Sequence, residues 1–257
     1  MSSPAAAKLA GKTVRRLGFG TMRLTGPGIW GPPTNEENAL AILRAAVIAG
    51  VQHIDTADAY GPHTAEELIC KALHPYPDDL LIATKGGFAR HGPDRWVACG
   101  SPVYLRQCVE LSLRRLNVES IDLYYLHRID PSIPIADQIG ELDQMRVEGK
   151  IKALGLSKVD LHQVEEARKI APIAAIQNSF SIRNRDSEPI IRWCEQHDTA
   201  FVAYAPLEAG KWLHMKSSSS TADTLKELLA FSPAVFPIPG TSNLQHLEEN
   251  LMAGLAP

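Results

Sequence analysis

Short apolar segments alternate along the chain with longer segments in which apolar residues recur every three or four positions. A short apolar run is typical of a strand buried on both faces, and the longer spacing is typical of a helix with one buried face. The alternation therefore predicts a series of strand–helix repeats. The expected strands cover residues 17–22, 53–56, 80–84, 121–126, 151–156, 174–178, 200–205 and 234–238. The expected helices cover residues 35–50, 64–73, 103–116, 135–148, 161–170, 188–197 and 222–230, with a last helix from about residue 243.

Eight repeats of this kind predict an α/β fold whose parallel strands close into a (β/α)₈ TIM barrel. The alternative is an open doubly wound sheet, which would place a G-x-G-x-x-G motif directly after the first strand. Residues 18–20 give only Gly-Phe-Gly, and no helix follows at once, so we favour the barrel. We expect one barrel domain over residues 1–257, with residues 1–12 as a disordered tail and residues 13–16 as one arm of a hairpin.

Composition narrows the classes of partner and compartment. The chain is 45% hydrophobic and 21% charged, with a net charge of −3 and no long basic run, which disfavours nucleic acid and anionic membranes as partners. The four cysteines have no C-x-x-C spacing, so we expect reduced thiols in a cytoplasmic protein, without disulfides or a metal site. No apolar run approaches the roughly 18 residues that span a bilayer. We expect a monomer or weak oligomer that acts on a small molecule.

Four ionisable residues fall at or just beyond the ends of predicted strands: Asp55, Tyr60, Lys85 and His127. The carboxyl ends of the strands in a (β/α)₈ barrel meet at one rim, where active sites lie. Taken singly, each residue has a structural explanation, such as a turn cap, a packed ring or a solvated loop charge. Taken together, an acid, a phenol, a lysine and an imidazole at one rim predict an active site.

These side chains suit proton transfer to a carbonyl oxygen. A phenol loses its proton near pH ~10, and a neighbouring lysine cation held by a carboxylate would lower that pKa. Tyr60 would then exchange a proton with a carbonyl or an alcohol near neutral pH, and His127 would orient the carbonyl. None of the four groups supplies a hydride, so a reduction would need a cofactor.

Several motifs follow one another in a characteristic order: D-T-A-D-A-Y-G, A-T-K, D-L-Y-Y-L-H, G-L-S-K, I-Q-N-S-F and P-I-P-G-T-S through E-E-N. In these motifs, which span nearly the whole chain, the protein resembles the aldo-keto reductase family. The resemblance implies a (β/α)₈ barrel that binds NADPH or NADP and reduces an aldehyde or ketone to an alcohol. It maps the family's catalytic residues onto Asp55, Tyr60, Lys85 and His127, with Tyr60 as the proton donor.

The resemblance also implies contacts to the cofactor along the same rim. Ser157 and Gln177 match positions that bind the nicotinamide carboxamide, and Tyr204 matches the aromatic residue that stacks on the nicotinamide. The other matching positions are Gly20 and Thr21 after the first strand, Ala205, Pro206 and Leu207 along the pyrophosphate, Gly240, Thr241 and Ser242 at the adenosine phosphate, and Glu249 and Asn250 at the adenine.

The last third of the chain departs from the family pattern. His246 stands where several relatives carry an arginine that grips the 2′-phosphate, and loss of that bidentate contact leaves NADH open as a cofactor. Residues 207–233 are fewer than in most relatives, and the chain ends soon after Asn250. We therefore expect a barrel with a shortened C-terminal third and a thinly covered cofactor cleft.

The substrate prediction rests on two loops. Residues 26–33, G-P-G-I-W-G-P-P, and Y-G-P-H at residues 60–63 are similar to bacterial pyridoxal reductases within the family. Trp30 would then line the substrate pocket, unless it only packs its loop against the barrel. Two other functions stay open: a non-catalytic NADP(H)-binding subunit similar to potassium-channel β-subunits, and a Schiff-base aldolase with Lys85 as nucleophile.

Overall fold

The computed structural model describes residues 6–208 and 220–254, and their core is a sheet of eight parallel strands. Each strand lies beside the next strand of the series, so the sheet order follows the chain. This is the predicted (β/α)₈ arrangement, and it brings all strand carboxyl ends to one rim. The strands are β3 (Phe19–Gly20), β4 (His53–Asp55), β5 (Leu81–Gly86), β8 (Leu123–Leu126), β9 (Leu154–Ser157), β10 (Ile173–Ser179), β11 (Ala200–Tyr204) and β12 (Val235–Pro237).

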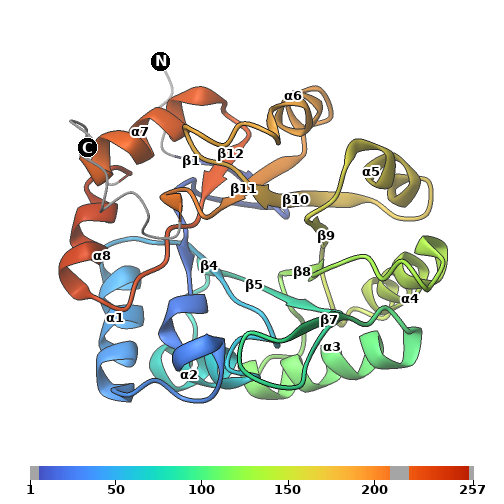
Figure 1. Ribbon diagram of the computed structural model, residues 1–257, viewed down its shortest axis with the longest axis horizontal. Coiled ribbons are helices and arrows are strands. Elements are labelled where there is room, and N and C mark those ends of the chain that lie inside the picture. The colour runs from blue at the N-terminus through green and yellow to red at the C-terminus, as the bar shows by residue number, and fades with distance from the viewer. Residues whose placement is uncertain (1–5, 209–219, 255–257) are drawn as a thin grey trace.

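Eight α-helices are described, and Figure 1 shows them as an outer ring around the strands. Side chains that precede several helices accept a hydrogen bond from the first turn; Asn35, Ser101 and Asp160 are examples. The apolar face of each helix packs against the strands, as the sequence spacing predicted. The helices are α1 (Glu36–Ile48), α2 (Thr64–Leu73), α3 (Pro102–Leu116), α4 (Ile135–Val147), α5 (Leu161–Arg168), α6 (Glu188–Gln196), α7 (Thr221–Phe231) and α8 (Leu244–Leu251).

The ring of strands closes where the first strand meets the segment after the last. The Gly18 amide donates to the Pro237 carbonyl at 2.9 Å, and the Gly20 amide donates to the Pro239 carbonyl at 3.3 Å. The backbones approach so closely that a Cβ on Gly240 would lie 2.4 Å from the Gly20 carbonyl oxygen. Glycine is therefore required at the seam that joins the two ends of the sheet.

The opposite end of the barrel is covered by a hairpin of β1 (Ala6–Leu9) and β2 (Lys12–Arg15). Leu9 and Val14 are fully buried against residues at the starts of the barrel strands. The expected hairpin arm at residues 13–16 is thus confirmed within one residue. We predicted that residues 1–12 form a disordered tail, and this was wrong from Ala6 onward. The alanines of this segment give little contrast between apolar and polar positions, so the strand that buries Leu9 was not recognised.

Another hairpin, β6 (Phe88–Arg90) and β7 (Trp96–Ala98), follows β5 in a segment that we expected to be a loop. It lies at the carboxyl rim, so its side chains reach the site described below. Residues 209–219, part of the segment 207–233 that we expected to be shortened, lie outside the described residues.

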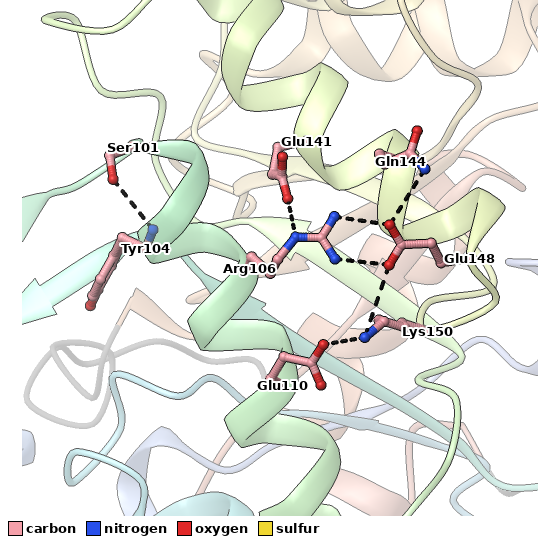
Figure 2. Close-up of polar contacts among 8 residues, drawn as sticks. All are labelled: Ser101, Tyr104, Arg106, Glu110, Glu141, Gln144, Glu148 and Lys150. Carbon is pink, nitrogen blue, oxygen red and sulfur yellow. Dashed lines mark hydrogen bonds and ion pairs between the residues drawn. The ribbon is translucent and has the colours of Figure 1, made fainter.

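Helices α3 and α4 are held side by side by an ion-pair network (Figure 2). Arg106 on α3 binds Glu141 at 2.5 Å and both carboxylate oxygens of Glu148, at 2.8 and 3.0 Å. Lys150 extends the network by pairing with Glu110. Because these groups are partly exposed, their ion pairs add little to the free energy of unfolding. The network mainly sets how α3 and α4 lie against each other.

Three sequence expectations can be compared with the described residues. No helix among them is long and apolar enough to cross a membrane. All four cysteines, Cys70, Cys99, Cys108 and Cys194, are free thiols. No cluster of three or more metal-ligating side chains occurs in residues 6–208 and 220–254.

Candidate active site

Adjacent strands bring the four predicted catalytic residues together. Asp55 ends β4, Lys85 lies near the end of β5, and His127 directly follows β8. Tyr60 lies in the loop between β4 and α2. The parallel pairing of β4 with β5 and of β5 with β8 therefore places all four at one sector of the carboxyl rim.

Asp55 and Lys85 form a buried ion pair. The Lys85 ammonium donates to Asp55 Oδ1 at 2.5 Å and to the Thr56 carbonyl at 2.7 Å, and Gln177 Nε2 donates to Asp55 Oδ2 at 2.6 Å. Burial lowers the pKa of Lys85, and the Asp55 charge opposes that shift. These contacts hold the ammonium behind the site, which does not suit the free amine that a Schiff-base aldolase needs.

Tyr60 is the proton-bearing group that faces this pair. The Lys85 ammonium lies 5.3 Å from the centre of the Tyr60 ring. Burial raises the pKa of Tyr60 above its ordinary value of 10.0, and the Asp55 charge raises it further. The net shift is therefore upward, not downward as the sequence predicted, because burial and the Asp55 charge outweigh the cations of the site. Tyr60 is held as a protonated phenol, the form that donates a proton.

His127 lies edge-on to Tyr60, with 5.8 Å between the ring centres. Burial lowers the pKa of His127 well below 6.5, and the nearby charges of Lys85 and Arg128 lower it further. The imidazole is therefore neutral at physiological pH. Its Nδ1 atom is buried and has no partner among the described residues.

A cavity of about 720 Å³ opens in front of these residues. Asp55, Tyr60 and His127 line it, while Lys85 lies behind them and is fully buried. All thirteen residues that the sequence assigned to a cofactor also line the cavity; their individual contacts stay a prediction. They are Gly20, Thr21, Ser157, Gln177, Tyr204, Ala205, Pro206, Leu207, Gly240, Thr241, Ser242, Glu249 and Asn250.

The wall beside His127 is aromatic, but Trp30 is not part of it. Trp30 is partly exposed and does not line the cavity, contrary to the sequence expectation. Phe88 and Trp96 from the β6–β7 hairpin line it, with ring centres 5.0 and 6.4 Å from that of His127. Trp30 instead forms a backbone bridge with Gly61, and its ring centre lies 5.6 Å from the guanidinium carbon of Arg90, which fits the alternative of a residue that packs its loop.

Arg90 connects the aromatic wall of Phe88 and Trp96 to the neighbouring loops. Its guanidinium carbon lies 3.6 Å from the centre of the Trp96 ring. Its N–H groups donate to five backbone carbonyls, among them those of Ile29 and Ala59. The loop over residues 26–33 thus shapes the site indirectly, by holding the residue that supports Trp96.

Sequence reasoning missed Phe88, Trp96 and Arg128, which all line the cavity. Two three-residue arms flank the turn at Gly92-Pro93-Asp94, a hairpin signal that was available in the sequence. Arg128 directly follows His127, but only the fold shows that its side chain enters the cavity.

The far end of the cavity has features that suit an anionic group of a dinucleotide. Thr241, Ser242 and His246 line it beside the N-terminus of α8, where the helix dipole favours negative charge. Gly20 and Gly240 also line this cavity, and their backbones pack so closely that a Cβ on either would collide with backbone atoms. The cavity runs from this end to Tyr60, as an extended cofactor requires.

The comparisons with known proteins agree with this geometry. The model of the aldo/keto reductase family matches residues 16–228. The chain belongs to the aldo/keto reductase family. An uncharacterized oxidoreductase of Schizosaccharomyces pombe is 43% identical over 96% of this chain and 83% of its own length. The pyridoxine 4-dehydrogenase of Escherichia coli is 40% identical, over 95% of this chain and 91% of its own length.

Among solved structures, the glycerol dehydrogenase of Gluconobacter oxydans superposes with a TM-score of 0.87 at 26% identity, covering 98% of this chain and 90% of that one. The (β/α)₈ fold and the family predicted from the sequence are thus confirmed. As an aldo-keto reductase, the chain is an enzyme, and its candidate site brings Tyr60, His127 and the Asp55–Lys85 ion pair together.

Proposed function

We propose that this aldo-keto reductase uses NADP(H) to reduce an aromatic aldehyde of the pyridoxal type to the corresponding alcohol. Support for the substrate class comes from the aromatic wall of Phe88 and Trp96 beside His127. A flat pyridine ring suits such a wall, because aromatic rings pack favourably at offset or edge-on geometry. The similarity to a pyridoxine 4-dehydrogenase points to the same class.

Each polar side chain has one task in this reaction. Ser157, Gln177 and Tyr204 in the cavity would hold the nicotinamide of NADPH, which would supply the hydride. The Tyr60 hydroxyl gives its proton to the carbonyl oxygen, which the raised pKa of Tyr60 permits because the phenol is protonated at neutral pH. The neutral imidazole of His127 orients that oxygen from the same wall of the cavity.

The Lys85–Asp55 pair acts from behind the tyrosine. When Tyr60 loses its proton, the ammonium 5.3 Å from its ring stabilises the phenolate that remains. Asp55 keeps the ammonium in place through a 2.5 Å contact. In the reverse direction, the same phenolate would remove the proton of the alcohol.

The compartment we propose is the cytoplasm. Cys70, Cys99, Cys108 and Cys194 are free thiols, which suits a reducing environment. Cys108 and Cys194 are also buried, so they act as small apolar side chains of the core.

The test is a fluorescence titration with NADPH and with NADH, followed by the absorbance of the reduced nicotinamide after addition of pyridoxal. We expect tight binding of NADPH and loss of the absorbance with pyridoxal, faster than with glyceraldehyde, which lacks a ring. Tyr60→Phe serves as the inactive control. Binding without turnover of any aldehyde would favour the alternative of a non-catalytic cofactor-binding subunit.

A further inference from the structure

Arg128 is a partly buried cation in the cavity with no acidic partner. Its Nη1 atom donates to the His127 carbonyl at 2.6 Å and to Ser157 Oγ at 3.2 Å. No ion pair links it to a carboxylate within residues 6–208 and 220–254. Residues 209–219 contain no Asp or Glu either. The charge therefore lacks a side-chain counter-ion.

Two other partly buried arginines, Arg115 and Arg90, do have partners for their charge or their donors. Arg115 donates to the buried Glu66 carboxylate at 2.6 Å and to Ser112 at 3.2 Å. Arg90 donates to five backbone carbonyls. A guanidinium carries five N–H donors, so Arg128 keeps donors for a ligand that enters the cavity.

The surroundings of Arg128 place it on the substrate side of the site. Its guanidinium carbon lies 5.1 Å from the centre of the Phe88 ring. Burial lowers the pKa of Arg128, and the two groups that oppose this shift, Tyr204 and Tyr60, line the same cavity. The cation thus sits between the aromatic wall and the proton donor.

We propose that Arg128 is a specificity residue, which selects carbonyl substrates that carry an ionised oxygen, such as a phenolate or a carboxylate. This inference rests on the proposed carbonyl reduction and assigns the substrate class of the same cavity. An unpaired, partly desolvated guanidinium binds such an oxygen through charge-assisted hydrogen bonds. A neutral substrate would leave the charge without a partner, and the site would discriminate against it.

A competing role is support of Ser157, which the family resemblance assigns to the cofactor. In that case loss of Arg128 would weaken NADPH binding, and the charge of the substrate would not matter. The two roles therefore separate in two readouts: the affinity for NADPH, and the preference for an anionic over a neutral substrate.

The experiment compares wild type, Arg128→Met and Arg128→Lys with 2-, 3- and 4-carboxybenzaldehyde and their methyl esters. For the best acid, we expect the acid-to-ester ratio of kcat/KM to fall about tenfold or more in Arg128→Met, as for loss of a charge-assisted hydrogen bond. Arg128→Lys should keep part of the preference. Arg23→Met, which removes another cavity arginine, should keep the ratio of wild type.

Binding of benzoate and benzamide to the NADP⁺ complex, followed by tryptophan fluorescence, tests the same point without turnover. We expect Arg128→Met to lose benzoate binding while its affinity for NADPH stays within about threefold of wild type. If the protein reduced no aldehyde but showed this loss, the proposed reduction would fail and the anion site would stand. An unchanged acid preference, an equal loss in Arg23→Met, or a loss of NADPH affinity alone would overturn the assignment of Arg128.

Discussion

Gln177 reaches across the barrel from β10 and donates from Nε2 to Oδ2 of Asp55 on β4, at 2.6 Å. The other Asp55 oxygen accepts from Lys85 at 2.5 Å. Both oxygens of a fully buried carboxylate are therefore satisfied, and the lysine behind Tyr60 is fixed in position. Gln177 also lines the cavity, so it connects the cofactor side of the site to the proton donor.

Replacement of Gln177 by Met should therefore affect both stability and chemistry. One buried carboxylate oxygen would lose its donor, which costs about 1–3 kcal/mol of unfolding free energy. We also expect kcat to fall about tenfold, because a less constrained Asp55 holds Lys85 less well. Urea unfolding and single-turnover rates measure the two effects. Gln245→Met, on the exposed face of α8, is the control, and an unfolding midpoint equal to that of wild type would contradict the role of Gln177.

The sequence carried enough information to predict the barrel and to place the four predicted catalytic residues at one rim. Strand periodicity locates Asp55, Lys85 and His127, because each lies at the end of an apolar run, and a parallel barrel gathers such ends at one rim. Family motifs then placed every assigned cofactor residue on the cavity. The positions of these residues depend on local sequence patterns and on the rule that the carboxyl ends of parallel barrel strands meet at one rim.

Features that depend on packing between distant segments were not predicted. We assigned Trp30 to the substrate pocket because of the loop that contains it. The wall of the cavity is instead formed in part by Trp96, on which Arg90 stacks. The pKa of Tyr60 was predicted to fall, but burial and the nearby Asp55 charge, which are properties of the folded site, raise it. The sequence contains these residues, but only the fold sets their distances and exposure.

Two variants at the proton donor separate chemistry from binding. Tyr60→Phe keeps the ring and removes the proton, so we expect turnover to fall by a factor of about 10³ or more while NADPH affinity stays near wild type. Lys85→Met should also abolish turnover, because the phenolate of Tyr60 would lose its cation. Steady-state kinetics and fluorescence titration give both readouts, and unchanged turnover in Tyr60→Phe would remove this residue from the mechanism.

The seam of the barrel predicts opposite effects for two glycines. A Cβ on Gly240 would lie 2.4 Å from the Gly20 carbonyl oxygen, whereas a Cβ on Gly140 of α4 meets nothing within 4 Å. Gly240→Ala should therefore destabilise the protein by several kcal/mol and weaken NADPH binding, because the seam also lines the cavity. Gly140→Ala should stabilise it by about 1 kcal/mol through helix propensity. Thermal unfolding compares them, and equal midpoints for the two variants would contradict the close contact at the seam.

Asp58 lies between β4 and Tyr60 and should make stability depend on pH. Its side chain is buried, its Oδ1 has no partner among the described residues, and burial together with the Glu66 charge raises its pKa from 3.8 to about 7. The folded protein therefore keeps a proton on Asp58 that the unfolded chain releases above pH 3.8. The contribution of Asp58 to the free energy of unfolding is therefore fully present below pH 3.8 and is lost as the pH rises to about 7.

Asp58→Asn removes this titration and keeps the shape of the side chain. We expect the unfolding free energy of wild type to fall relative to that of Asp58→Asn as pH rises from about 4 to about 7, by a few kcal/mol, and then to stay level. Urea unfolding of both proteins at several pH values measures the difference. Asp137→Asn, at an exposed carboxylate in the first turn of α4, controls for the loss of one charge. A difference that stayed constant over this range, or that rose with pH in favour of wild type, would show that Asp58 is ionised in the folded protein.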